Sequence, residues 1–219
     1  MANTLQDPGV AAELDRMYTK SKNQMSLLRE KVGDLGRPMT TAERTELMSE
    51  FYIPVTPEAG RLLYALVRAT RPATVVEFGM SFGISAIHLA SGVRDNATGR
   101  VVTTELSDTK IAAAKRTFAD TGLDDVITIL EGDALTTLAD VDGPVDFVLL
   151  DGWKDLYLPV IKMLEPRLSS GALVVADNAS APDMQPYLDR VRNPDNGYVS
   201  FNFAVREGDS MELSCRTGD

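Results

Sequence analysis

Carboxylates, an amide and an amine follow two apolar stretches of the chain in a pattern that suits metal-assisted chemistry. Asp151 directly follows residues 145–150, and Lys154 comes three positions after it. The adjacent pair Asp177 and Asn178 directly follows the stretch GALVVA. If both stretches are neighbouring parallel strands, two carboxylates and one amide oxygen meet at one edge of a sheet. Mg²⁺ accepts such oxygens and keeps exchangeable positions for a chelating substrate.

Each of these side chains also has an ordinary structural role open to it. Asp177 or Asn178 could cap a helix, and Asp151 with Gly152 could form an exposed turn. Lys154 could lie exposed at the start of a helix. The group as a whole favours the cation site, because a separate structural reason would be needed for each member.

A glycine-containing turn precedes these motifs in the segment VVEFGMSFGIS. Glu77 ends the strand, Gly79 and Gly83 permit a tight turn and close approach to a ligand, and Ser85 enters the next helix. The spacing G-x-x-x-G differs from the G-x-G-x-x-G of dinucleotide sites. A tight turn without a ligand is the alternative.

Two further strand ends add polar groups. Glu105 ends RVVTTE, where a carboxylate can accept hydrogen bonds from ribose hydroxyls. Asp133 and Ala134 follow VITILEG, where they could meet an adenine, or Asp133 could cap the next helix. The three strand ends together indicate an adenosine-containing ligand more strongly than any one alone.

The elements that would position these residues alternate from residue 73 onward. Strands that are apolar almost throughout, each followed by a helix, indicate a doubly wound α/β domain with a mainly parallel sheet. YVSFNFAV and SMELSCR instead alternate in period two around REGDS, which predicts a terminal antiparallel hairpin. Residues 10–31 and TTAERTELMSEF predict helices, and a third begins at Thr56–Pro57 and ends near Pro72.

Composition excludes several classes of protein. The chain has 22 basic and 32 acidic residues, a net charge of −10, and no basic cluster, so we expect no nucleic-acid partner. One histidine and one cysteine cannot form a disulfide or the usual kind of zinc site. Export and membrane signals are lacking, so we expect a cytoplasmic protein without a membrane partner.

The motifs resemble those of the class I S-adenosylmethionine-dependent methyltransferases, specifically the metal-dependent catechol O-methyltransferase family, over about residues 55–180. VVEFGMSFGISAIHLA is similar to the family's cofactor loop and VVTTELS to its ribose-binding strand end. LLDGWKDLYLP and LVVADNAS resemble its two metal segments. The resemblance implies a seven-stranded Rossmann-like sheet in a methyltransferase domain of residues 57–219. We expect residues 1–56 to form a helical lid, a homodimer contact or both.

The resemblance also implies residue roles. Lys154 would be the general base, since a nearby divalent cation disfavours the ammonium form. Magnesium or another divalent cation would be held by Asp151, Asp177 and Asn178. S-adenosylmethionine would be held by Val55, Glu77, Gly79, Ser85, Glu105, Asp133 and Ala134. The acceptor would be a small hydroxylated molecule, an aromatic vicinal diol chelated on the cation.

The chain departs from the family pattern in two places. Gly152 stands where the mammalian catechol enzyme has a histidine, so we expect a more open wall beside the cofactor. After Ser180 the likeness fades, and the family's acidic substrate contact cannot be assigned to Glu207 or Glu212.

Two other functions remain open at this point. A nicotinamide-dependent oxidoreductase would need a phosphate-binding glycine loop, against which the G-x-x-x-G spacing argues. A non-catalytic adenosylmethionine-binding protein would leave the cation ligands and Lys154 without a purpose.

Overall fold

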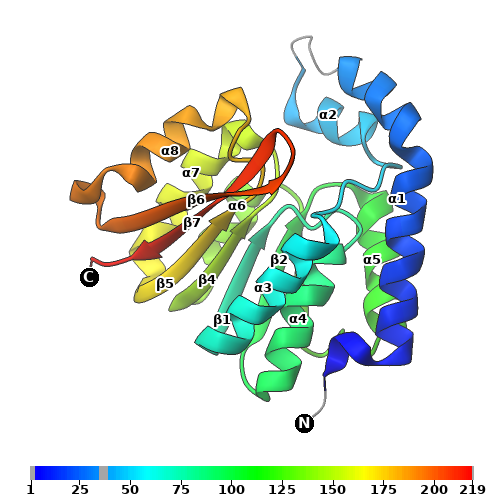
Figure 1. Cartoon of the computed structure of the whole chain (residues 1–219), viewed down its shortest axis with the longest axis horizontal. Coiled ribbons are helices and arrows are strands. Elements are labelled where there is room, and N and C mark those ends of the chain that lie inside the picture. The colour runs from blue at the N-terminus through cyan, green and yellow to red at the C-terminus, as the bar shows by residue number, and fades with distance from the viewer. Residues whose placement is uncertain (1–2, 35–38, 219) are drawn as a thin grey trace.

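The computed structural model describes residues 3–34 and 39–218, in which a seven-stranded sheet lies between two layers of helices (Figure 1). The strands are β1 (Thr74–Phe78), β2 (Arg100–Glu105), β3 (Ile127–Glu131), β4 (Val145–Leu150), β5 (Leu168–Ala176), β6 (Tyr198–Arg206) and β7 (Asp209–Arg216). The α-helices are α1 (Pro8–Asp34), α2 (Thr41–Leu47), α3 (Pro57–Thr70), α4 (Ile84–Asn96), α5 (Asp108–Asp120), α6 (Ala134–Thr137), α7 (Tyr157–Leu164) and α8 (Gln185–Arg192).

The strand order is β3-β2-β1-β4-β5-β7-β6. Strands β1 to β5 pair in parallel, whereas β7 pairs antiparallel with both β5 and β6. The predicted doubly wound α/β fold with a terminal antiparallel hairpin is therefore confirmed. The chain order reverses between β1 and β4, which is where open α/β sheets bind ligands.

Side chains of the central strands alternate between two apolar cores. On one face, Val75, Phe147 and Leu149 pack with α1, α3, α4 and α5. On the other face, Val76 and Val148 pack with α6, α7 and α8. Because helices cover both faces, the strands need apolar side chains in nearly every position.

The N-terminal helices pack directly on this body. Val10, Leu14 and Met17 of α1 belong to the same buried cluster as α3 and α4. Figure 1 shows α1 running beside α5, where the Thr117 hydroxyl donates to Glu13 at 3.0 Å. The predicted boundary at residue 56 and the dimer role stay predictions. No helix in the described part of the chain is both long and apolar enough to cross a membrane.

Two predicted helix starts are confirmed. Thr40 begins α2 in a capping box with Glu43. Thr56 caps α3 by accepting a hydrogen bond from the backbone of Ala59, and Pro57 takes the first helical position. Each cap satisfies a backbone amide in the first turn of its helix and so stabilises the helix start.

Candidate active site

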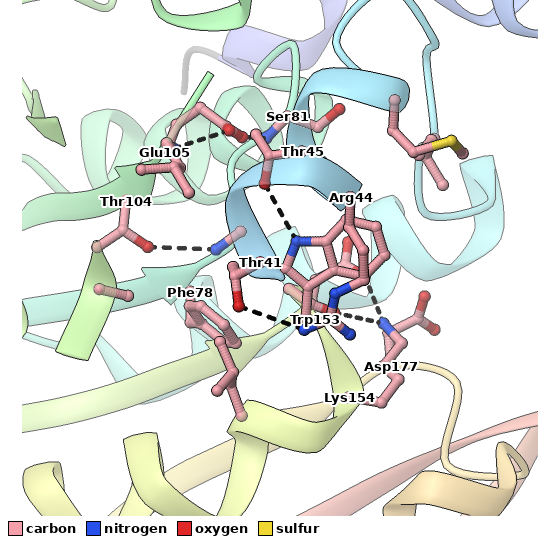
Figure 2. Close-up of a pocket in the computed structure, with 18 of the residues that line it drawn as sticks. Thr41, Arg44, Thr45, Phe78, Ser81, Thr104, Glu105, Trp153, Lys154 and Asp177 are labelled. Atoms are coloured by element: carbon pink, nitrogen blue, oxygen red, sulfur yellow. Dashed lines mark hydrogen bonds and ion pairs between the residues drawn. The ribbon is translucent and has the colours of Figure 1, made fainter. Parts of the chain in front are cut away.

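The carboxyl ends of the parallel strands open onto a cavity of about 630 Å³ (Figure 2). Its far wall is formed by α2 and the residues that follow that helix. Most of the residues selected from the sequence line this cavity, namely Gly79, Glu105, Asp133, Ala134, Asp151, Lys154, Asp177 and Asn178. The fold therefore brings predicted cofactor residues and the predicted cation ligands with Lys154 to one cavity.

Three predicted cofactor residues lie behind the cavity wall. Val55 is 1% exposed within the core, although the two residues before it line the cavity. Glu77 is fully buried and accepts a hydrogen bond from the Thr103 hydroxyl, and burial raises its pKa to about 7. Ser85 is also buried and borders a small adjoining void. Their direct contacts with a cofactor stay predictions.

Glu105 is held at the end of β2 by three backbone amides. Its Oε1 accepts hydrogen bonds from the amides of Leu106 and Ser107 at 2.8 Å. Its Oε2 accepts one from the amide of Ser81, also at 2.8 Å (Figure 2). The Ser81 hydroxyl is buried and has no hydrogen-bond partner among the described residues. A fixed carboxylate beside an unsatisfied hydroxyl fits a polar ligand such as a ribose.

Asp133 caps α6. Its Oδ1 accepts a hydrogen bond from the backbone of Leu135 at 3.0 Å, which confirms the capping role. The side chain is exposed and lines the cavity together with Ala134. The contact of this turn with an adenine stays a prediction.

Gly79 lets the loops after β1 and β4 touch. Its φ is +98°, and a Cβ there would lie 2.5 Å from backbone atoms of Gly152. A Cβ at Gly152 would in turn lie 2.5 Å from the ring of Phe78. Phe78 also lines the cavity, and its ring lies against Gly152 where a side chain would otherwise be. The more open wall expected beside Gly152 stays a prediction.

Asp151 and Asp177 converge from adjacent parallel strands, whose last paired residues are Leu150 and Ala176. The Asp151 side chain is 12% exposed and Asp177 is 5% exposed. Burial, and then the nearby Asp177 carboxylate, raise the pKa of Asp151 well above its usual range. Burial also raises the pKa of Asp177. Two buried carboxylates this close repel each other, and a divalent cation would relieve that repulsion.

Asn178 follows this pair with its amide group oriented by the terminal hairpin. Its φ is +56°, and its Nδ2 donates to Asp209 Oδ2 at 2.7 Å. The same Asp209 oxygen accepts from the Arg206 guanidinium at 2.5 Å. With the nitrogen engaged, the amide oxygen is the atom of Asn178 suited to a cation.

Within residues 3–34 and 39–218, no three His, Cys, Asp or Glu side chains gather in a metal-binding group. The predicted ligands are two carboxylates and one amide, which is a different donor set. Their metal role stays a prediction.

Lys154 lies beside the acidic pair. Its Nζ is 3.7 Å from Asp151 Oδ1 and donates to the Gly152 carbonyl at 3.0 Å and the Tyr157 hydroxyl at 2.8 Å. The Tyr157 hydroxyl in turn donates to the Asp177 carbonyl at 3.3 Å. These contacts hold the amine next to the predicted cation ligands.

Trp153 joins this segment to α2. Its Nε1 donates to the Thr45 hydroxyl at 3.3 Å, and the Arg44 guanidinium lies 4.7 Å from the ring centroid (Figure 2). Arg44 also forms an ion pair with Asp155 at 2.9 Å. The sequence did not indicate these contacts between α2 and the segment after β4, because the paired residues lie more than 100 positions apart in the chain.

Comparison with known proteins identifies the family. A methyltransferase domain family matches residues 76–179. A probable O-methyltransferase of Mycobacterium tuberculosis is 32% identical over 166 residues, which cover 71% of this chain and 70% of that protein. The catechol O-methyltransferase of Mus musculus is 34% identical over 181 residues, which cover 77% of this chain and 67% of that protein.

Solved structures share the fold. An O-methyltransferase from Bacillus cereus in complex with SAH gives a TM-score of 0.71 at 18% identity, covering 92% of this chain and 100% of that one. The O-methyltransferase TomG from Streptomyces achromogenes in complex with SAM gives 0.68 at 22% identity, covering 83% and 92%. The similarity to the curated O-methyltransferases contradicts the oxidoreductase alternative. The chain belongs to the class I S-adenosylmethionine-dependent O-methyltransferases, of the catechol O-methyltransferase-like type.

Proposed function

We propose that the chain transfers a methyl group from S-adenosylmethionine to one hydroxyl of a small aromatic vicinal diol, of the catechol kind, chelated on Mg²⁺. The observation that carries the proposal is the convergence of Asp151 and Asp177 beside Lys154 in the cavity. The catechol O-methyltransferases among the relatives support this choice of acceptor.

The cofactor would occupy the part of the cavity bounded by β1, β2 and β3. Glu105, whose carboxylate is already oriented by backbone amides, would accept hydrogen bonds from the ribose hydroxyls. The buried hydroxyl of Ser81 would gain the partner that it lacks among the described residues. The Asp133–Ala134 turn would border the adenine.

The oxygens of Asp151, Asp177 and Asn178 would hold the cation. The donor set fits Mg²⁺, which prefers carboxylate and amide oxygens and retains positions for a substrate. A bound cation would lower the pKa of a coordinated hydroxyl and fix its position. The close burial of the two carboxylates supports the assignment, because a positive charge between them offsets their repulsion.

Lys154 would accept the proton of the acceptor hydroxyl. Its amine is oriented by the Gly152 carbonyl and the Tyr157 hydroxyl and lies beside Asp151. Trp153, held against α2, would form an apolar wall for the aromatic ring and help to exclude water. The chain would thus contribute a base, an oriented acceptor site and an apolar wall.

A methyl-transfer assay tests the proposal. Catechols and caffeoyl-type esters are offered with S-adenosylmethionine and Mg²⁺, and each is matched with a monohydroxyl analogue. We expect the diols to react about 100-fold faster, since a single hydroxyl cannot chelate and is poorly positioned. Equal rates for diols and monohydroxyl analogues would contradict chelation.

A further inference from the structure

Lys110 is a buried ammonium group in the cavity that the proposed reaction does not use. It lies in the first turn of α5, is 6% exposed and lines the cavity. Among the residues that the structure describes, its Nζ makes no hydrogen bond and no ion pair. Its contact is with the Phe82 ring, whose centroid is 5.6 Å away.

The Lys110 side chain is largely buried and lines the cavity, and its ammonium has no hydrogen-bond acceptor among the described residues, an arrangement that favours a ligand acceptor. The Phe82 ring offsets part of the cost of this burial through a cation–π contact. Burial still lowers the pKa of Lys110, while the charges of Glu105 and then Asp151 raise it. A ligand oxygen that enters the cavity would supply the missing hydrogen bond.

The neighbourhood of Lys110 selects the kind of oxygen. Glu105 precedes it by five residues and also lines the cavity. An ionised carboxylate only accepts hydrogen bonds and an ammonium only donates them. A vicinal diol satisfies both, since its O–H groups can donate to Glu105 while its oxygen lone pairs accept from Lys110. A ligand carboxylate would suit Lys110 but would be repelled by Glu105 and Asp151.

We infer that Lys110 is a cofactor-binding residue that donates a hydrogen bond to a ribose hydroxyl oxygen of S-adenosylmethionine, opposite Glu105. The inference rests on the proposed function, because it requires an adenosine cofactor in this part of the cavity. It adds a cationic donor to the ribose site, where the sequence motif indicates a carboxylate alone.

Calorimetric titration with S-adenosylhomocysteine tests this role in wild type, Lys110→Met and Lys115→Met. Methionine keeps the length of the apolar stem and removes the ammonium. Lys115, on the same helix, is the matched control, because it is exposed and paired with Glu131 at 2.6 Å. We expect Lys110→Met to raise Kd by about 10- to 100-fold, the loss of one hydrogen bond to a charged group, and Lys115→Met to leave it unchanged.

A second titration, with the 2′,3′-dideoxy analogue of S-adenosylhomocysteine, isolates the contact. Without ribose hydroxyls, wild type and Lys110→Met should bind the analogue equally. If wild type and Lys110→Met bind S-adenosylhomocysteine itself with equal affinity, the inference is overturned. It is also overturned if the variant binds the dideoxy analogue more weakly than wild type does.

Two controls keep the outcomes distinct. If Lys110→Met does not fold, the same two titrations are made with Lys110→Gln. The expected loss of affinity is then smaller, because glutamine retains a neutral hydrogen-bond donor. If wild type fails to bind S-adenosylhomocysteine, the proposed function itself is contradicted, and the inference falls with it. A wild type that binds, beside a Lys110 variant that binds equally well, overturns the inference alone.

Discussion

The cavity has a half proposed for the cofactor, at the ends of β1 to β3, and a half proposed for the acceptor, at the ends of β4 and β5 and at α2. Contacts of different range build these two halves. On the cofactor side, Glu105 is fixed by the amides of Leu106 and Ser107, which follow it directly. On the acceptor side, Arg44 of α2 pairs with Asp155 across 111 positions of the chain. The cofactor half is thus built largely from strand ends and their own loops, whereas the acceptor half needs segments that only the complete fold brings together.

This difference has a functional consequence. Substitutions in the acceptor half should change methyl transfer and leave cofactor affinity nearly intact, and substitutions in the cofactor half should change cofactor affinity first. Substitutions at four positions, taken from the largest expected effect to the smallest, can break or sharpen the distinction.

Lys154→Ala, in the acceptor half, should lower the single-turnover rate by about 10²–10⁴-fold, the usual loss for a general base. Affinity for S-adenosylhomocysteine should stay at the wild-type value. Lys154→Arg should be nearly as slow, because a guanidinium retains its proton. If arginine restores the wild-type rate, the position supplies only positive charge and the base role fails.

Glu77→Gln, behind the cofactor half, should remove a pH-dependent part of the folding free energy. The folded pKa of Glu77 is raised from 4.5 to about 7, so its contribution is fully present below pH 4.5 and is lost as the pH rises through 7. The shift corresponds to about 3 kcal/mol. Urea unfolding at several pH values should show this decline in wild type and a flatter profile in the variant. Parallel profiles would exclude Glu77 as its source.

Glu105→Ala should weaken cofactor binding by about 1–3 kcal/mol, the range for hydrogen bonds to a charged group. Cation binding by the acceptor half should be unchanged. Calorimetry on the folded variant measures both quantities. Unchanged cofactor affinity would remove Glu105 from the ribose site, and a loss of cation affinity would show that the two halves are not separate.

Arg44→Gln should have the smallest effect, because its ion pair is partly exposed and such pairs contribute about 0.2–1 kcal/mol. Trp153, the single tryptophan of the chain, reports the change directly. Its fluorescence emission should shift to longer wavelength as α2 separates from the ring, while cofactor affinity stays constant. An unchanged spectrum would mean that Arg44 does not hold α2 in place.

The same contrast explains how much of the molecule was predictable. Apolar strands followed by helices predicted the sheet, because both faces of β1 and β4 must be buried. Polar residues at the strand ends were predicted to meet, since parallel strands deliver them to one edge. Eight of the selected residues do line the cavity.

What the sequence did not reveal depends on packing between distant segments. The Phe78 ring fills the space beside Gly152, which no local pattern indicates. The contact of Trp153 with Thr45 requires α2 to fold back over the sheet. Lys110 reads as an ordinary charged residue of an amphipathic helix, and only its 6% exposure marks it as unusual.

Single-turnover methyl transfer to a catechol, measured before and after a chelator removes divalent cations, tests the central claim most directly. Removal of divalent cations by the chelator should abolish methyl transfer by the wild type, and added Mg²⁺ should restore it. In the Asp177→Ala variant, Mg²⁺ should fail to restore transfer although S-adenosylmethionine still binds, because Asp177 is a proposed cation ligand in the acceptor half. Full activity of the metal-free wild-type protein would contradict the assignment of Asp151, Asp177 and Asn178 and the chelated acceptor with it.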